Sequence, residues 1–278
     1  MTTPTRFRRR NVLPGFGLSA AITSLVVTAL VVFPLAVLVM RAASLGPTDF
    51  LAAAWTPRAR AAYAVSLGTS AVAAVISSVL GLLVAWVLVR INFPGRRLLD
   101  ALVDVPLALP TAVAGLVYST LYVERGWLGR FLVPLGIQGA YSLLGIVLVL
   151  VFVSLPFAVR VVQPVLESLD RDTEEAARIL GASRLQIFLR VIFPAILPAV
   201  LTGFALALAR ALGEYGSVVF ISGNMPFKTE IAPVLIVSRL EEFAYAEATT
   251  IAVVLLAMSI TLLVVVNTLQ QRVARNAQ

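Results

Sequence analysis

Long apolar runs constrain this chain more than any other feature of its sequence. A helix needs about 20 mostly apolar residues to cross the hydrocarbon core of a membrane. Only a structure that satisfies its own backbone hydrogen bonds, such as a helix, is stable there. Six runs meet the length requirement, at about 16–40, 61–89, 98–122, 141–159, 191–219 and 249–269. We therefore predict an all-α integral membrane protein with about six transmembrane helices.

The composition agrees with this fold class and excludes several kinds of chemistry. The chain is 60% hydrophobic and 13% charged, which is unlike a soluble domain of 278 residues. It contains no cysteine and no histidine, so disulfides, thiolate chemistry and Ser-His catalysis are excluded. An intramembrane enzyme would lack its usual groups. We predict that the chain is not an enzyme and has no metal site.

The positions of the basic residues predict an orientation. If both termini face the cytoplasm, the inside segments carry 14 basic residues and the outside segments carry 7. This bias favours both termini inside, and it explains the net charge of +8 without nucleic acid as a partner. We expect a basic cytoplasmic tail at 1–15, one transmembrane domain at 16–270 and a cytoplasmic tail at 271–278. The loop at about 160–190 would then be cytoplasmic.

That loop contains a charged segment, LDRDTEEAARILGAS, between two apolar runs. Asp172 followed by Glu175 resembles a capping box, with Thr173 as an alternative cap. Gly181 is placed to end or kink the helix. We predict a cytoplasmic helix of two to three turns whose glutamates and small alanines face another protein. The alternative is a solvated loop that only connects two spans.

The order of residues in this segment resembles a known motif. Glu175-Ala176-Ala177 is followed after three residues by Gly181, and nine residues later by VIFP at 191–194. This pattern is similar to the EAA motif of ABC-importer permeases, with valine and phenylalanine replacing isoleucine and leucine. The resemblance implies a type I ABC-importer permease with a coupling helix that docks on a separate ATPase subunit. The coupling residues it implies are Glu174, Glu175, Ala176, Ala177 and Gly181.

The chain has no evident means of hydrolysing ATP alone. It contains one lysine, Lys228, and no G-x-x-x-x-G-K-[ST] sequence that could hold phosphates. We therefore expect no cofactor on this chain. ATP and magnesium would be bound by the partner ATPase.

A second polar segment, ARALGEYGSVVFISGNMPFKTE, begins inside the fifth predicted span and extends beyond it. Arg210 and Glu214 are four residues apart and can pair on one helix face. They could form a structural ion pair, or Arg210 could add positive potential to an anion path. Candidates for the translocation path or its gate are Arg210, Glu214, Tyr215, Ser217 and Thr111, with Ser66, Ser70 and Ser77 on the second span. We expect Asp100 and Asp104 to be interfacial partners of Arg96 and Arg97.

Two runs extend the resemblance to a substrate class. ALGEYGSVVFISGNMPFKTEIAPVLI and DVPLALPTAVAGLVYSTLY are similar to sulfate/thiosulfate permeases of the T (or U) type. The likeness covers the second span to the sixth. It implies a subunit of an ATP-driven sulfate/thiosulfate importer for sulfur assimilation in the bacterial inner membrane. The implied partners are a second homologous permease in a heterodimer, two ATP-binding subunits and a periplasmic sulfate/thiosulfate-binding protein.

Two other functions remain open from the sequence. The same machine could carry molybdate, tungstate or phosphate. A secondary transporter or channel that works alone is a different class, and it would use paired ionisable groups at mid-membrane for proton or sodium coupling. Such a transporter would leave the EAA-like segment unexplained.

Overall fold

The computed structural model describes residues 16–276, and every regular element in that part of the chain is helical. Five continuous helices are long and apolar enough to cross a membrane, and a bent pair makes a sixth candidate. The predicted tail at 1–15 lies outside the described residues. The last helix continues to Asn276, into the segment predicted as a cytoplasmic tail at 271–278, and the limits of that tail stay a prediction.

Three long helices form the packed centre of the molecule: α4 (Pro57–Arg90), α8 (Leu143–Ser168) and α11 (Phe193–Leu212). Small residues line their contacts, as is usual where membrane helices approach closely. A Cβ built on Gly81 of α4 would lie 2.6 Å from the Cβ of Ala158 of α8, and Gly203 of α11 lies against the same alanine. The three backbones therefore meet around Ala158.

The fifth span differs from its predicted limits. It begins before the predicted residue 191, with α10 (Arg184–Ile187) and a π-helical turn η3 (Phe188–Ile192), and runs as one helix to Leu212. Gly213 follows as the C-cap. Residues 213–217 then form turns, and a separate short helix α12 (Val218–Ile221) follows. The predicted end at 219 was wrong, because the glycines at 213 and 216 interrupt the helix.

The third predicted span is broken. It consists of α5 (Arg96–Ala108) and α6 (Thr111–Tyr122), which meet at 107°. Leu109 is extended (φ −82°, ψ 131°), as expected for a residue that precedes a proline. Our prediction of one continuous helix at 98–122 was therefore wrong at Pro110.

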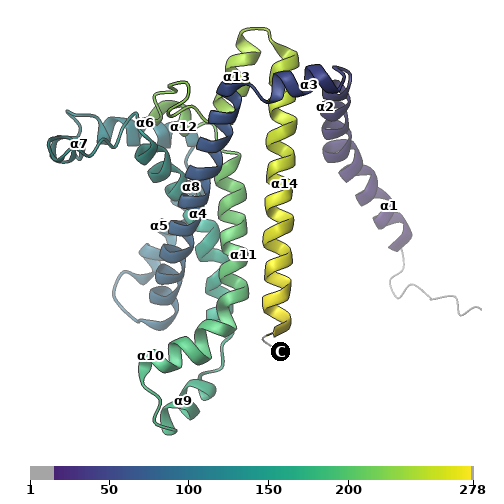
Figure 1. The fold of residues 1–278 in the computed structure, drawn as a ribbon. Coiled ribbons are helices and arrows are strands. Elements are labelled where there is room, and N and C mark those ends of the chain that lie inside the picture. The colour runs from purple at the N-terminus through teal and green to yellow at the C-terminus, as the bar shows by residue number, and fades with distance from the viewer. Residues whose placement is uncertain (1–15, 277–278) are drawn as a thin grey trace, which may run out of the picture.

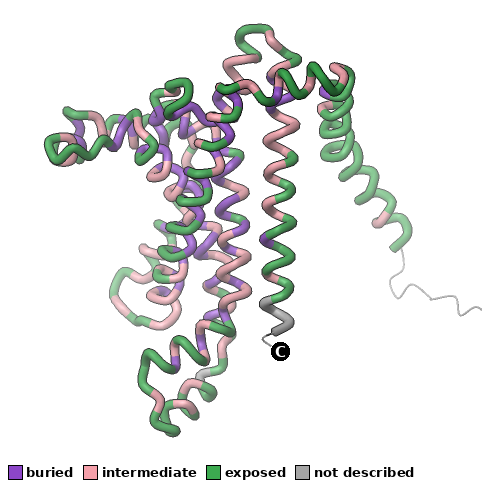
Figure 2. Tube along the Cα trace, in the orientation of Figure 1, coloured by how far each residue is buried: buried purple, intermediate pink, exposed green. Residues whose placement is uncertain are grey.

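The first span stands apart from the rest (Figure 1). It combines α1 (Phe16–Val27), a π-helical turn η1 (Thr28–Val32) and α2 (Phe33–Ala43). Its most apolar window is 0% buried, and Figure 2 shows the exposed surface along its length. Only its end approaches the body, where α2 and α3 (Pro47–Ala54) contact α14 (Tyr245–Asn276).

The remaining short elements complete one end of the bundle: α7 (Gly129–Leu132), η2 (Val133–Leu135) and α13 (Ala232–Glu241). We call this end, with α3, α12 and α13, the outer end. The opposite end, where α4 and α14 finish, is the inner end (Figure 1). These names follow the predicted orientation.

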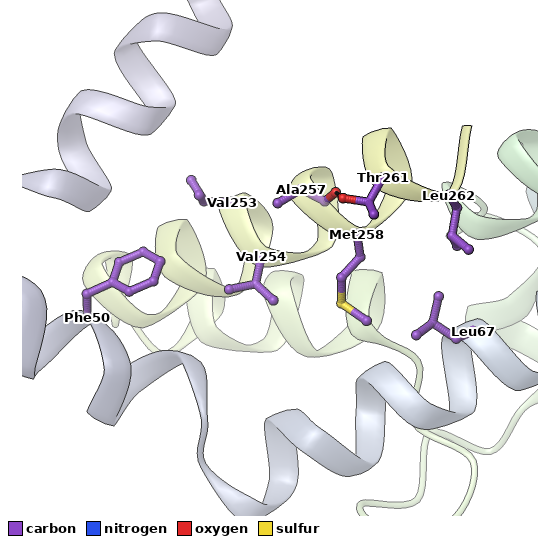
Figure 3. Close-up of a pocket in the computed structure, with 8 residues that line it drawn as sticks. All are labelled: Phe50, Leu67, Val253, Val254, Ala257, Met258, Thr261 and Leu262. Carbon is purple, nitrogen blue, oxygen red and sulfur yellow. Dashed lines mark hydrogen bonds between the residues drawn. The ribbon is translucent and has the colours of Figure 1, made fainter. Parts of the chain in front are cut away.

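An open groove of about 480 Å³ lies between α3, α4 and α14 (Figure 3). Its lining is almost wholly apolar and includes Phe50, Leu67 and Met258. The hydroxyl of Thr261 donates to the carbonyl of Ala257 on its own helix. This groove suits hydrocarbon and offers a divalent oxyanion no donors.

Candidate functional site

The charged segment forms a separate helix, α9 (Arg171–Ile179), at the inner end of the molecule (Figure 1). Its N-cap is Asp170, whose side chain accepts a hydrogen bond from the amide of Asp172 at 3.0 Å. The predicted caps at Asp172 and Thr173 were therefore wrong by two or more residues. The capping box of this region belongs to α10, where Ser183 and Gln186 exchange their hydrogen bonds.

The helix α9 has two different faces. Glu174 and Ala177, three residues apart, are half-buried on the side toward the bundle. Glu175 and Ala176 are exposed, and Ile179 and Leu180 at the end of the helix are 85% and 87% exposed. The coupling residues implied by the motif are thus divided between the two faces, because neighbouring residues on a helix point about 100° apart.

The chain turns sharply after α9. Gly181 has a φ of +82°, a left-handed conformation that glycine adopts without strain. The amide of Gly181 donates to the carbonyl of Arg178 at 3.0 Å, and that of Ala182 to Ala177 at 3.1 Å. The glycine of the motif therefore ends α9 and sends the chain into α10.

An ion pair ties the inward face of α9 to the end of α4. Nη2 of Arg90 lies 2.5 Å from Oε1 of Glu174, and the two side chains are 12% and 17% exposed. The guanidinium of Arg90 also lies 5.6 Å from the ring centre of Trp86, one turn earlier on α4. Trp86 in turn packs edge-on against Phe188 of η3. From the sequence, Arg90 is one of the 14 basic residues that predict the orientation, and its contact with Glu174 was not predicted.

A second charged cluster joins α5 to α8. Arg160 of α8 donates to Asp100 at 2.6 Å and to both carboxylate oxygens of Asp104, at 2.9 and 2.6 Å. Our prediction that Arg96 and Arg97 pair with these aspartates was wrong. Asp100 and Asp104 lie one turn apart on α5, so one arginine on the facing helix can reach both.

The polar side chains of the outer segment, residues 210–217, bind to one another. Arg210 pairs with Oε2 of Glu214, whose side chain is 3% exposed. The other oxygen, Oε1, accepts hydrogen bonds from the amide and the hydroxyl of Ser217, both at 3.0 Å. The donors of Ser217 are therefore engaged by Glu214 within the same chain. Arg210 and Glu214 thus form the ion pair that their spacing predicts, and a role of Arg210 in an anion path stays a prediction.

Thr111 lies beside this segment. A Cβ on Gly216 would overlap the hydroxyl of Thr111, and a Cβ on Gly115 would overlap the carbonyl oxygen of Ser217. Tyr215 is half-buried and packs on the core formed by α4, α8 and α12. Four of the residues proposed for the path or gate thus lie at the end of α11 and in residues 213–217, and the fifth, Thr111 at the start of α6, packs against that segment. What brings them together is backbone packing at two glycines.

The serines of the second span lie inside the bundle. Ser66, Ser70 and Ser77 are at most 2% exposed. The hydroxyl of Ser66 accepts from the amide of Ala232 at 2.7 Å, and that of Ser77 lies 2.8 Å from the hydroxyl of Ser154 on α8. These bonds join elements of one chain, which is the common role of hydroxyls between membrane helices.

An ion pair at the outer end, between Arg58 and Glu230, was not predicted from the sequence. Nε and Nη2 of Arg58, at the start of α4, donate to the two oxygens of Glu230 at 2.9 and 2.7 Å. Glu230 is 2% exposed. The only available signal was the expectation that a carboxylate among apolar residues needs a basic partner.

Comparison with known proteins places the chain in a family. The family model described as "Binding-protein-dependent transport system inner membrane component" matches residues 77–278. Among curated proteins, the chain is 52% identical over 250 residues to "Sulfate transport system permease protein CysT" of Synechocystis sp., covering 90% of this chain and 87% of the relative. It is 47% identical over 266 residues to the protein of the same name from Escherichia coli, covering 96% of each.

Solved structures support the fold. A bacterial alginate ABC transporter in complex with an alginate pentasaccharide-bound periplasmic protein includes a chain that matches with a TM-score of 0.75 and 18% identity. That match covers 93% of this chain and 95% of the other. A chain of the MetNI methionine ABC transporter in an inward-facing conformation matches with a TM-score of 0.54 and 19% identity, over 77% and 93% of the two chains. The chain belongs to the binding-protein-dependent transport system inner membrane components, in the family of the CysT-type permeases.

Proposed function

We propose that this chain is a membrane-spanning subunit of an ATP-driven sulfate/thiosulfate importer in the bacterial inner membrane. It would convert ATP hydrolysis by a separate ATPase into alternating access to a path across the membrane. The relatives named as sulfate transport permeases support the substrate. The alternative substrates are molybdate, tungstate and phosphate, and a stand-alone secondary transporter is the less favoured class.

The observation that carries this proposal is the exposed face of α9, which points away from the helix bundle. A charged helix at the inner end that served only as a connection would have no reason to present Ile179 and Leu180 to solvent. These residues, with Glu175 and Ala176, form a surface with an apolar edge and an acidic centre. Such a surface fits a cleft on an ATPase subunit that offers basic groups, and the small alanine allows close approach.

The anion would cross the membrane between two permease chains. Within this chain, Ser66, Ser77 and Ser217 are engaged in internal hydrogen bonds, and Arg210 is paired with Glu214. The groove of Figure 3 is apolar. A second homologous permease would complete the path, and backbone amides at the break between α5 and α6 could supply donors for a divalent oxyanion.

The remaining partners follow from this division of labour. Two ATP-binding subunits would bind ATP and magnesium, since this sequence has no phosphate-binding loop. A periplasmic protein would deliver sulfate or thiosulfate to the outer end. When the ATPase pair closes, the displacement of α9 would pass into the helix Arg184–Leu212, which follows it after a short turn.

The test is uptake of labelled sulfate into proteoliposomes that contain this chain with its second permease, ATPase and binding protein. Glu175→Lys is the variant, and Glu124→Lys at the opposite end is its matched control, since both glutamates are exposed. We expect ATP-driven uptake in the wild type and the control. In Glu175→Lys we expect loss of uptake together with weaker ATPase binding.

The alternatives give different outcomes in the same assay. Uptake of molybdate or phosphate in place of sulfate would change the substrate and keep the machine. Uptake without any ATPase would contradict the assignment of α9 and favour a secondary transporter.

A further inference from the structure

We propose that the ion pair between Arg90 and Glu174 is a pivot that transmits displacement of α9 to α4. This inference rests on the proposed function, in which an ATPase displaces α9. The chain connects α9 covalently to α8 and, through a turn, to α10. The helix α9 also packs against α10 and η3, and Ala177 contacts the apolar core at the inner end. The ion pair adds a link to α4, between residues 84 positions apart in sequence.

Each residue of the pair lies at a helix end whose dipole stabilises its charge. Arg90 is the last residue of α4, where the negative end of the helix dipole stabilises a cation. Glu174 lies in the first turn of α9, where the positive end of the dipole stabilises an anion. Both side chains are more than four-fifths shielded from solvent, so salt screens the pair less than it would a surface pair. The ion pair thus joins the C-terminal end of α4 to the N-terminal end of α9, and each helix dipole stabilises the charge at its own end.

The pair is held through one contact, which distinguishes it from the outer pair of Arg58 and Glu230. Arg58 uses two nitrogens and so fixes both the distance and the orientation of its partner. Arg90 uses Nη2 alone, and its Nε is buried without a hydrogen-bond partner in the described residues. A single contact restrains the distance between the helices and leaves α9 able to rotate.

Aromatic packing continues from Arg90 into the bundle. The guanidinium of Arg90 lies over the ring of Trp86, and Trp86 contacts the ring of Phe188. The ring centre of Phe188 lies 5.9 Å from that of Phe193, at the start of α11. Movement of Glu174 would therefore reach α4 directly and α11 through two rings. Since α4 and α11 pack on α8, the three helices could move as one body.

The neighbouring charges allow the pivot to be removed without unfolding α9. Glu175 and Arg178 line the same small groove as Arg90 and Glu174. In an Arg90→Gln variant, Arg178 stands four residues after Glu174 and can become its partner on the same helix. The helix α9 would then remain folded and lose its connection to α4.

The experiment uses the complete transporter in proteoliposomes and measures sulfate ions moved per ATP hydrolysed. For Arg90→Gln and Glu174→Gln we expect normal subunit assembly, continued ATP hydrolysis and about a tenfold lower ratio. The charge exchange Arg90→Glu with Glu174→Arg should recover the ratio to within about threefold of the wild type, because it restores the ion pair. Recovery is incomplete because each charge then lies at the unfavourable end of its helix dipole. Arg97→Gln, an exposed arginine on α5, is the matched control and should leave the ratio unchanged.

Singles with a wild-type ratio, or an exchange variant no better than the singles, would overturn the pivot. If the singles fail to assemble, a second variant decides. The chain has no cysteine, so Arg90→Cys with Glu174→Cys provides two unique thiols, which a cleavable bis-thiol crosslinker can join across the gap that the two shortened side chains leave. We expect crosslinking to raise the ratio and cleavage of the crosslink to lower it; a crosslinked form no better than the cleaved form would overturn the proposal.

Failure of the proposed function would be visible separately in the wild type. A wild-type complex that moves another oxyanion changes the substrate, and the ratio is then measured with that anion. A wild-type complex that neither binds nor stimulates an ATPase would remove the displacement of α9, and the pivot would fall with it.

Discussion

The two charged segments of this chain, α9 at the inner end and residues 210–217 at the outer end, use similar residues in opposite ways. In the outer segment, the buried Glu214 binds Arg210 through one oxygen and Ser217 through the other. In α9, Glu174 is paired and Glu175 is exposed. The outer segment therefore has its carboxylate fully engaged, whereas the inner one presents a second carboxylate to solvent.

This difference separates structural from docking charges in a membrane protein. A buried carboxylate must be satisfied by its own chain, and once satisfied it has little left to offer a ligand. An exposed carboxylate on a short helix contributes little to folding and is available for contact. Substitutions in the two segments should consequently change different properties.

Glu214→Gln should cause the largest loss of stability. It leaves Arg210 without its counter-charge and weakens the bonds from Ser217. Breaking a fully buried pair costs about 3–5 kcal/mol, and because the Arg210 side chain is 30% exposed we expect a loss at the low end of this range. Thermal unfolding of the purified permease in detergent measures this loss, with the exposed Glu124→Gln as control. A variant with wild-type stability and altered transport would instead make Glu214 part of the anion path.

Gly115→Ala should follow in size. The added methyl would overlap the backbone oxygen of Ser217 and force α6 away from the outer segment, at a cost of about 1–3 kcal/mol. The control is Gly68→Ala on α4, where a Cβ meets no atom within 4 Å. Unfolding in detergent should separate the two variants clearly. Equal stability would show that α6 is free to move at this contact.

Ser77→Ala should have a small effect. It removes the hydrogen bonds of the Ser77 hydroxyl to Ser154 and to the carbonyl of Val151 on α8, and such bonds between membrane helices contribute about 0.6 kcal/mol each on average. Ser78→Ala is a neighbouring control, because the hydroxyl of Ser78 donates to Ala74 on its own helix. Sulfate uptake should be unchanged in both. A large loss of uptake in Ser77→Ala alone would place that hydroxyl in the path.

Glu175→Lys should have the smallest effect on the isolated permease, within about 0.5 kcal/mol of the wild type. Its side chain is exposed, in contrast to the buried, paired side chain of Glu214. The measurement is again thermal unfolding in detergent. A strongly destabilised variant would mean that Glu175 belongs with the structural charges, and the contrast between the two segments would fail.

The sequence predicted most of what depends on local composition. The apolar runs located the spans, because a membrane permits few structures other than helices. The charged segment was correctly predicted as a helix that ends at Gly181, because its alanines and its glycine act locally. The break at Pro110 was missed, although the proline was visible. Prolines 156 and 198 lie inside continuous helices, so the sequence does not show which proline breaks a helix.

The pairing of charges could not be predicted for a different reason. Asp100 and Asp104 have basic neighbours in sequence, and yet their partner is Arg160, 56 or more residues away. The same holds for Arg90 with Glu174 and for Arg58 with Glu230. These contacts depend on how the helices are arranged around one another, which no local pattern records.

The glycine contacts have a consequence for genetics. Every missense change at Gly81 or Gly115 enlarges the side chain, so both positions should appear in screens for loss of function. Their suppressors should differ. The atom nearest to an added methyl at position 81 is the Cβ of Ala158, and Ala158→Gly removes it. At position 115 the obstruction is the main-chain carbonyl of residue 217, which every amino acid carries, so no codon change at 217 can relieve it.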